Sequence, residues 1–159
     1  LKSDQFNNNK YLDLIKKNNV VSICVRQNRF SERIKNKNSY LSKKQSDNFV
    51  KDTIDYIYRS IEFIRTRVDN PKFLVWSNDF KNLKQYFPSQ QFIFVDNKEK
   101  KILTDFYLFT KCKNFIIAPS TFNWWGAWLS SEQNKICIRP KNLNLSNNAN
   151  FWPENWISI

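Results

Sequence analysis

The stretch NFIIAPSTFNWWGAWLSS, residues 114–131, decides the fold of this chain. Its first five residues form an apolar run typical of a buried strand, and Ser120 is a favoured N-cap residue at the start of a helix. The helix expected over 121–131 carries three tryptophans and Gly126, the only glycine among the 159 residues. A strand that passes directly into a helix predicts one step of a β-α-β unit, and therefore a parallel sheet.

The aromatic residues of this helix predict how it packs. Trp124 and Trp128 are four residues apart, a spacing that puts both side chains on one helix face, so we expect them to pack the helix onto the sheet. Trp125 lies about a quarter turn away and must face something else. A glycine inside a helix costs about 1 kcal/mol relative to alanine. Gly126 therefore indicates the close approach of a neighbouring element, with a ligand as the alternative.

Outward from this stretch, apolar runs alternate with helical patterns. Strands are expected at residues 20–26, 72–77, 91–95, 114–118 and 135–139. Helices are expected from Ser46 to just before Asn70, and over 79–87, 98–112 and 121–131. Residues 27–46 are polar and irregular, and the tail over 140–159 is rich in asparagine. This alternation predicts an α/β fold with a Rossmann-like parallel sheet, in the strand order 3-2-1-4-5, flanked by helices.

A sheet of this order predicts the place of the binding site. Ligands bind at the carboxyl ends of the strands, where the strand order reverses. Here that point lies between the loop carrying Arg26 and the loop carrying Ser120 and Thr121. A helix N-terminus and a guanidinium together suit a phosphate group. The alternative is that Ser120 only caps its helix and that Arg26 is a surface charge.

Two carboxylates are further candidates for ligand contacts. Asp105, in the helix expected over 98–112, could accept two N–H bonds from the edge of a guanine base, or it could simply be solvated. Asp79 follows the second strand and could contact the ligand or cap its own helix.

Composition excludes several classes of protein. A hydrophobic content of 41% excludes a disordered chain, and there is no apolar run long enough for a transmembrane helix. The absence of histidine excludes a histidine base, a histidine-bound metal and a Ser-His-Asp triad within these residues. No glycine-rich dinucleotide fingerprint or P-loop is present. The three cysteines, Cys24, Cys112 and Cys137, are expected to be reduced core thiols of a cytoplasmic protein.

The net charge of +12 raises the question of an anionic partner. The lysines are scattered and form no basic stripe with exposed aromatic residues, so we do not expect nucleic-acid binding. A nucleotide phosphate or an anionic membrane surface would also suit this charge. The chain starts at Leu1 and contains no methionine, so we expect a single domain over residues 1–159 that is a fragment of a longer protein.

One long block of the sequence resembles a known family. DFYLFTKCKNFIIAPSTFNWWGAWLS (105–130) is similar to the C-terminal signature of the α-1,2-fucosyltransferases of glycosyltransferase family 11. WSND (76–79), KICIRPKN (135–142) and PENWISI (153–159) resemble further segments of that family, in the same order and at similar spacing.

The resemblance implies the C-terminal, nucleotide-sugar-binding half of a GT-B-type enzyme, without its N-terminal half. The implied reaction is inverting and metal-independent, needs no cofactor, and moves L-fucose from GDP-fucose to the 2-hydroxyl of a galactosyl glycan or glycolipid. Carried over by position, Arg26 is the catalytic residue that holds the diphosphate, and Asp105 recognises guanine. The implied phosphate contacts come from the start of the aromatic helix, at Ser120, Thr121, Phe122 and Asn123. A peripheral position at the inner membrane face is compatible with this reaction.

One motif departs from the family pattern. Where the family reads approximately HIRRGDY, this chain reads CVRQNRF (24–30), which keeps Arg26 but puts Cys24 in place of histidine and Gln27 in place of the second arginine. Arg29 could restore the charge lost at Gln27. This divergence leaves open a nucleotide-sugar-binding module without catalysis. A fucosyltransferase of another linkage is a further alternative, because in this family the acceptor pocket largely belongs to the N-terminal half.

Overall fold

The computed structural model describes residues 9–29, 39–96, 102–141, 148 and 150–159. The helices are α1 (Lys10–Lys17), α2 (Ser39–Arg65), α3 (Ile102–Thr110) and α4 (Thr121–Trp128), with a short 3-10 helix, η2, at Leu83–Gln85. The strands are β1 (Val20–Val25), β2 (Lys72–Ser77), β3 (Phe92–Phe94), β4 (Asn114–Ile116), β5 (Cys137–Arg139) and β6 (Ile157–Ser158).

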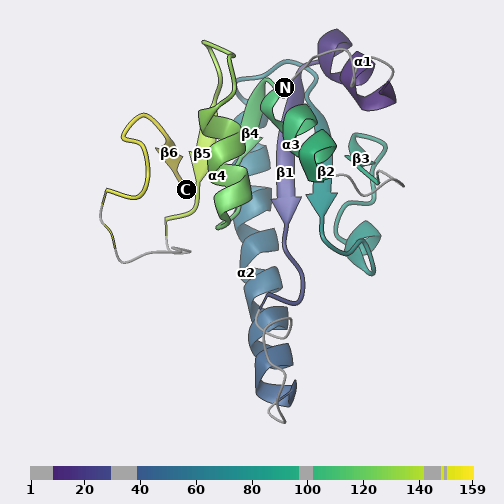
Figure 1. Ribbon diagram of the computed structural model, residues 1–159, viewed down its shortest axis with the longest axis vertical. Coiled ribbons are helices and arrows are strands. Elements are labelled where there is room, and N and C mark those ends of the chain that lie inside the picture. Colours follow the sequence, from purple (N-terminus) through teal and green to yellow (C-terminus); the bar gives the residue numbers. More distant parts are fainter. Residues whose placement is uncertain (1–8, 30–38, 97–101, 142–147, 149) are drawn as a thin grey trace.

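The strands form one sheet in the order β3-β2-β1-β4-β5-β6, and every neighbouring pair is parallel (Figure 1). The predicted order of the first five strands is confirmed. The chain then returns after β5 and adds β6 beside it, a strand that the asparagine-rich tail did not suggest. Because all strands run the same way, the loops after β1, β2 and β4 meet at one edge of the sheet.

Helices cover both faces of this sheet (Figure 1). On one face, α2 packs against the alternate side chains of β1, Val21, Ile23 and Val25, in an aliphatic core. On the other face, α1, α3 and α4 cover an aromatic core around Phe109 and Phe115. Strands buried on both faces explain why the strand sequences are nearly continuous apolar runs instead of alternating ones.

Helix α2 is longer than the sequence indicates. Its expected start at Ser46 is wrong, because the helix begins at Ser39 and its amino-terminal half projects past the carboxyl edge of the sheet (Figure 1). The apolar spacing of three and four starts only near Val50, where the helix meets the sheet, so hydrophobic periodicity could not detect the projecting part.

Other boundaries also differ from those expected. The helix predicted over 79–87 is only the single turn η2, because Asn82 has a positive φ of 64° that interrupts helical geometry. The first residues of the helix predicted over 98–112 lie outside the described part of the chain, and α3 is described from Ile102. Helix α1 was not predicted. Within the described segments, no helix has the length and apolar character needed to cross a membrane.

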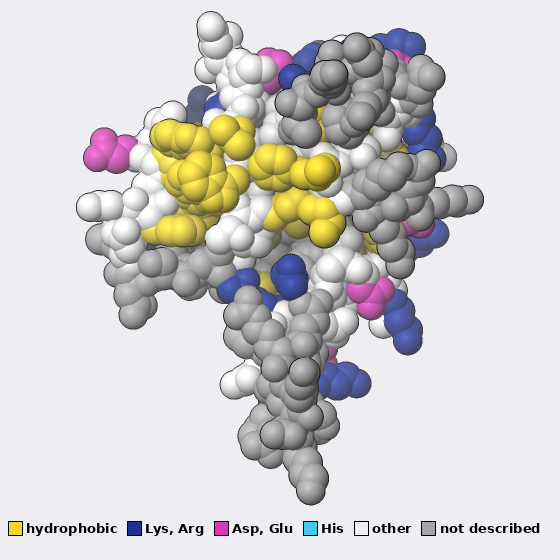
Figure 2. Space-filling model, viewed as in Figure 1, with side chains coloured by type: hydrophobic (Ala, Val, Ile, Leu, Met, Phe, Trp, Pro, Cys, Tyr) yellow, Lys and Arg dark blue, Asp and Glu magenta, His cyan; other side chains and the backbone are white. Residues whose placement is uncertain are grey.

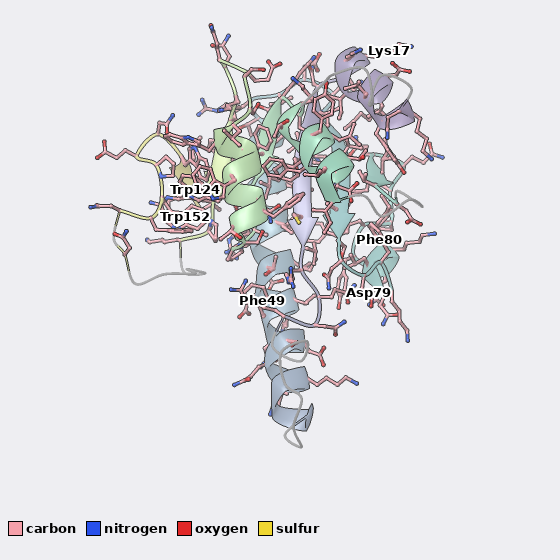
Figure 3. The ribbon with its side chains drawn as sticks, viewed as in Figure 1. Lys17, Phe49, Asp79, Phe80, Trp124 and Trp152 are labelled. Carbon is pink, nitrogen blue, oxygen red and sulfur yellow. The ribbon has the colours of Figure 1, made fainter. Side chains whose placement is uncertain are left out.

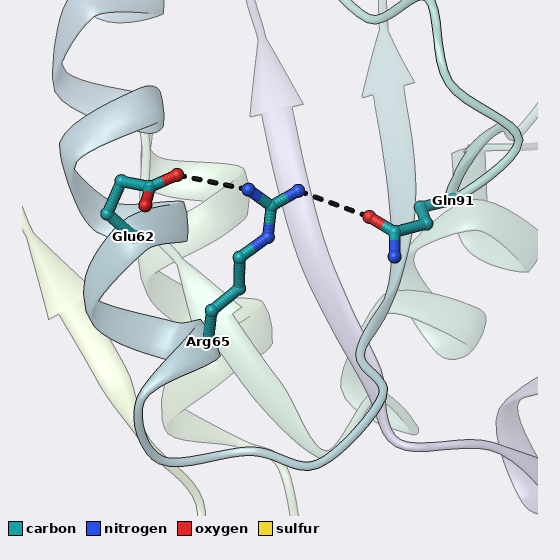
Figure 4. A network of polar contacts seen from close by, with 3 residues as sticks. All are labelled: Glu62, Arg65 and Gln91. Carbon is teal, nitrogen blue, oxygen red and sulfur yellow. Dashed lines mark hydrogen bonds and ion pairs between the residues drawn. The ribbon is translucent and has the colours of Figure 1, made fainter.

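A network of polar contacts lies at the amino edge of the sheet, opposite the carboxyl ends of the strands. Arg65, at the end of α2, donates to Glu62 Oε1 at 3.0 Å and to Gln91 Oε1 at 3.1 Å (Figure 4). This arginine joins the last turn of α2 to the segment that enters β3. The contacts are exposed, so they fix local geometry and contribute little to stability.

The glycine in α4 is explained by packing. A Cβ added to Gly126 would lie 2.4 Å from Cδ1 of Phe109, so α3 and α4 can approach this closely only because residue 126 has no side chain. The prediction of a close neighbouring element is confirmed. The prediction that Trp124 and Trp128 pack α4 onto the sheet is wrong for Trp128, which is 52% exposed, whereas Trp124 is partly buried against the aromatic core. The face that α4 buries consists of Asn123, Gly126 and Ala127.

Candidate functional site

A pocket of about 260 Å³ lies at the carboxyl edge of the sheet, where the strand order reverses between β1 and β4. Three chain segments line it. The end of β1 contributes Cys24, Val25 and Arg26, and the end of β2 contributes Trp76, Ser77 and Asn78. The start of α4 contributes Ser120 and Phe122, and α3 contributes Ile102 and Asp105. Arg26, Asp105, Ser120 and Phe122, all predicted site residues, are therefore brought together in one pocket.

The loops after β1 and β2 are joined through main-chain contacts. The Asn78 side chain accepts a hydrogen bond from Gln27 N at 2.8 Å and donates to Gln27 O at 3.0 Å. The Gln27 side chain donates in turn to the carbonyl oxygens of Asp79 at 2.6 Å and Lys81 at 2.9 Å. Gln27, which departs from the family motif, thus has a structural role in holding the β2 loop beside Arg26.

The loop after β1 is also joined to the loop that precedes α4. Arg29 Nη1 donates to the carbonyl oxygen of Pro119, and its guanidinium lies over the Phe49 ring at 5.0 Å. Asn28, in the position of the family's glycine, has a φ of 55°. Asparagine tolerates this left-handed conformation better than most residues, so the turn is retained without glycine. Phe30, the last residue of the divergent motif, lies outside the described residues.

Ser120 caps α4 as predicted. Its backbone is extended, with φ −150° and ψ 146°, and its hydroxyl accepts a hydrogen bond from Asn123 N at 3.2 Å. The N–H groups of the first helical turn, at Thr121 and Phe122, have no acceptor within the helix and are available to an anion. The Phe122 ring is held edge-on against Phe106 at 5.3 Å and Phe109 at 5.7 Å, which fixes this wall of the pocket.

Cys24 forms the floor of the pocket, beside its parallel register partner Trp76. Burial raises the pKa of the Cys24 thiol from its ordinary value of 9.0 to about 11, and the neighbouring Asn123 amide and the Arg26 charge only partly oppose this rise. The thiol is therefore neutral at physiological pH. Two buried thiols, Cys112 and Cys137, are also unpaired, in agreement with the prediction of reduced core cysteines.

Asn123 lies behind Cys24, not at the pocket surface. Its side chain is fully buried, and neither Nδ2 nor Oδ1 has a hydrogen-bond partner among the described residues. The amide is close enough to Cys24 to lower the pKa of the thiol, but it does not have the geometry of a hydrogen bond. Trp76 Nε1 and Ser22 Oγ, on the same face of the sheet, are also buried without a partner there.

The structure does not bring two further predicted residues into this pocket. Asp79 uses its carboxylate to accept a hydrogen bond from Lys81 N at 2.8 Å, so it stabilises its own turn. Thr121 points away from the pocket, into a second pocket on the other side of the helix start. The sequence did not single out Trp76 and Ile102 as lining residues. Trp76 stands at the end of a predicted parallel strand, which is a usable signal, but no comparable signal marks Ile102.

Nothing in the described segments resembles a metal centre: no group of three or more Cys, Asp or Glu side chains is suitably placed. The polar groups that face the pocket are one guanidinium, one carboxylate, a carboxamide, hydroxyls and the start of a helix. Such a set of groups can bind an anion and one hydrogen-bonding edge of a base.

A Rossmann-like parallel sheet with a pocket at its reversal point is typical of domains that bind phosphorylated ligands. Comparison with known proteins gives the family. Residues 5–159 match the family model for glycosyl transferase family 11, and the chain belongs to this family.

Two curated relatives from Escherichia coli agree with this family. The chain is 34% identical over 109 residues to an O-antigen biosynthesis glycosyltransferase, WbnK, covering 67% of this chain and 36% of the relative. It is 31% identical over 112 residues to an alpha-1,2-colitosyltransferase, covering 65% of this chain and 38% of the relative. The match thus spans little more than a third of the length of either relative. No solved structure gives a significant match.

Proposed function

We propose that this chain is the GDP-fucose-binding part of a glycosyltransferase that moves L-fucose to the 2-hydroxyl of a galactosyl glycan with inversion. The observation that carries the proposal is the single pocket in which Arg26, Asp105 and Ser120 meet from three separate segments. Membership of glycosyl transferase family 11 supports sugar transfer, and one relative, the alpha-1,2-colitosyltransferase, carries an alpha-1,2 linkage in its name.

In this proposal Arg26 is the catalytic residue. Cleavage of the sugar–phosphate bond leaves both electrons on the GDP oxygen, while the acceptor hydroxyl attacks the sugar carbon from the opposite face and loses its proton. The guanidinium and the N–H groups of Thr121 and Phe122 stabilise the charge that develops on the diphosphate. Because these groups are already held in place, they need little rearrangement during the reaction.

Asp105 gives the pocket its preference for a base. A carboxylate accepts two hydrogen bonds and donates none, so it matches the adjacent N1–H and N2–H of guanine. Adenine presents no such pair of donors on that edge. The position of Asp105 in the first turn of α3, across the pocket from Ser120, is compatible with a base at one end and phosphates at the other.

The remaining parts of the proposal concern conditions and partners. The reaction uses no metal and no cofactor, since Arg26 and the helix start supply the positive charge. The acceptor is a glycan or glycolipid, nucleic acid is not a partner, and the protein acts in the cytoplasm at or near the inner membrane face. The net charge of +12 would favour an anionic membrane surface.

The test is fucose transfer by the protein expressed from its complete reading frame, with GDP-fucose and a galactoside acceptor. We expect Arg26→Ala to lower turnover by about 100-fold or more, as removal of a transition-state charge contact does, with a much smaller change in acceptor KM. Arg59→Ala is the matched control, because Arg59 is an exposed arginine of α2 away from this pocket. Unchanged turnover in Arg26→Ala would remove this residue from the mechanism.

The same experiment separates the alternatives. Product linkage, read by NMR, distinguishes transfer to the 2-hydroxyl from another linkage. Binding of GDP without any transfer by the complete protein would favour a non-catalytic nucleotide-sugar-binding module, the reading that the divergent CVRQNRF motif (24–30) leaves open.

A further inference from the structure

A second pocket, of about 270 Å³, lies beside the first and is separated from it by the start of α4. Ser120 and Phe122 line the first pocket, whereas Thr121, between them, lines the second. The other lining residues come from α4 and from the C-terminal segment: Trp124, Trp125, Asn148, Asn150 and Phe151. A ligand here would lie within one helical turn of the proposed phosphate site.

The C-terminal segment holds one wall of this second pocket in place. Trp124 Nε1 donates to the Phe151 carbonyl oxygen at 2.9 Å, and the Trp124 ring packs on Phe151 and Trp156 at 6.2 and 5.7 Å. Figure 3 shows Trp124 pointing from α4 toward the segment that carries Trp152. The aromatic wall is therefore held by contacts within the protein itself.

Trp125 is the exposed aromatic surface of the pocket. Its ring stands edge-on to Trp124, at 4.9 Å and 75°, yet 51% of the residue is exposed. Figure 2 shows hydrophobic side chains gathered on this side of the molecule. A large aromatic residue that is fixed by a neighbour but left half uncovered offers a flat apolar face to a ligand.

The polar groups around this face are neutral. Among the described residues, neither the Thr121 hydroxyl nor the Asn150 side chain has a hydrogen-bond partner. Asn148 Oδ1 accepts from Asn150 N at 2.9 Å, which shapes the turn that carries both carboxamides. Of the described residues that line the pocket, none carries a charge. The fitting ligand is uncharged, rich in hydroxyl groups, and apolar on one face.

We propose that this second pocket is a carbohydrate subsite that holds one pyranose unit, with its C–H face stacked on Trp125. Carboxamides and hydroxyls both donate and accept, so Asn148, Asn150 and Thr121 can match the alternating hydroxyl groups of a sugar. The volume is slightly below the ~300–1,000 Å³ of pockets for drug-sized ligands, which suits a single ring. Naming this sugar as part of the glycan acceptor rests on the proposed function.

The test compares two tryptophans of the same helix. Trp128 is 52% exposed and stacks on Trp124, but it does not line the second pocket, so Trp128→Ala is the matched control for Trp125→Ala. Saturation-transfer NMR of methyl β-galactoside is measured on the complete protein in the presence of GDP. We expect signals from the ring C–H face that weaken about tenfold in Trp125→Ala and persist in Trp128→Ala. Equal signals in both variants, or no signal in the parent protein, would overturn the subsite.

A second readout separates this proposal from the proposed function. GDP binding, followed by calorimetry, is expected to be unchanged in Trp125→Ala and weakened in Arg26→Ala. If fucose transfer is absent but galactoside binding depends on Trp125, the subsite stands and the proposed function fails. If transfer occurs and Trp125→Ala leaves the acceptor KM unchanged, the subsite fails and the proposed function stands.

Discussion

The two faces of the sheet differ in the side chains that cover them and in how well their buried polar groups are hydrogen-bonded. The face under α2 is mainly aliphatic, and its buried polar side chains are satisfied: Thr53 and Ser60 donate to carbonyl oxygens one turn earlier in α2, and Tyr56 donates to the Ile138 carbonyl at 2.8 Å. The face under α3 and α4 is aromatic and contains all three cysteines. It also contains buried polar atoms without partners among the described residues, on Ser22, Trp76 and Asn123.

Because of this difference, the ligand pockets and the core with satisfied polar groups lie on opposite faces of the sheet. Both pockets next to α4 lie on the α3/α4 side, and Trp76, one of the residues with an unsatisfied buried polar atom, lines the first of them. A buried polar group without a partner costs folding free energy of about 1–3 kcal/mol. The face under α2 carries no such cost within the described residues, so we expect this face to contribute more of the net stability.

The first test is a substitution that leaves a cavity in the core under α2 and should lower the stability of the protein. Ile61 is only 1% exposed, so Ile61→Ala removes buried methyl groups and should lower the free energy of unfolding by about 2–5 kcal/mol. Ile102→Ala is the control on the other side, where the residue is 73% exposed and the change should stay within about 0.5 kcal/mol. Urea unfolding measures both. Similar losses in the two variants would contradict the assignment of stability to the α2 face.

The second test concerns the contact between α3 and α4. Gly126→Ala puts a Cβ into the Phe109 ring, so we expect a loss of about 1–3 kcal/mol, despite the better helix propensity of alanine. Adding Phe109→Leu to Gly126→Ala should make the combined loss smaller than the sum of the two single losses. Additive losses in this double-mutant cycle would show that the glycine serves another purpose.

The sequence predicted the strands, the helix cap and the helix packing better than it predicted the buried polar groups that lack hydrogen-bond partners. The strand order, the Ser120 cap and the close approach at Gly126 all follow from local rules that apply wherever these residues occur. The meeting of Arg26 and Ser120 followed from the same topology. Asp105 was a candidate guanine contact from its residue type, with a solvated side chain as the alternative, and the family resemblance favoured the guanine contact.

What the sequence could not predict depends on tertiary contacts. The burial of Asn123 behind Cys24, and the use of the Asp79 carboxylate by its own turn, are set by how three loops meet. The exposure of Trp128 has the same origin, because the C-terminal segment packs on Trp124 and leaves the next turn of α4 uncovered. Hydrophobic spacing identifies an apolar helix face but not which part of that face is covered.

The third prediction concerns a buried thiol of the face under α3 and α4. Burial raises the pKa of Cys137 from 9.0 to about 12, and the Lys135 charge only partly opposes this rise. Above pH 9 the unfolded thiol loses its proton while the folded one keeps it, so this contribution to stability is complete below pH 9 and falls as pH rises toward 12. We expect Cys137→Ser to reduce the downward slope by about 1.4 kcal/mol per pH unit in that window. Parallel slopes for the two proteins, measured by urea unfolding from pH 8.5 to 10.5, would contradict it.

The smallest expected effects are those of two matched substitutions, one on each face of the sheet. They compare the faces most directly, because their effects on stability should have opposite signs. Asn123→Leu replaces an unpartnered buried amide with an apolar group of similar size, so stability should rise by about 1 kcal/mol. Thr53→Val makes the equivalent change under α2, where the hydroxyl donates to Phe49 O at 2.7 Å, so stability should fall by about 1 kcal/mol. A loss in both variants would mean that the Asn123 amide is satisfied in solution by an ordered water, and that the pocket floor is as well satisfied as the α2 core.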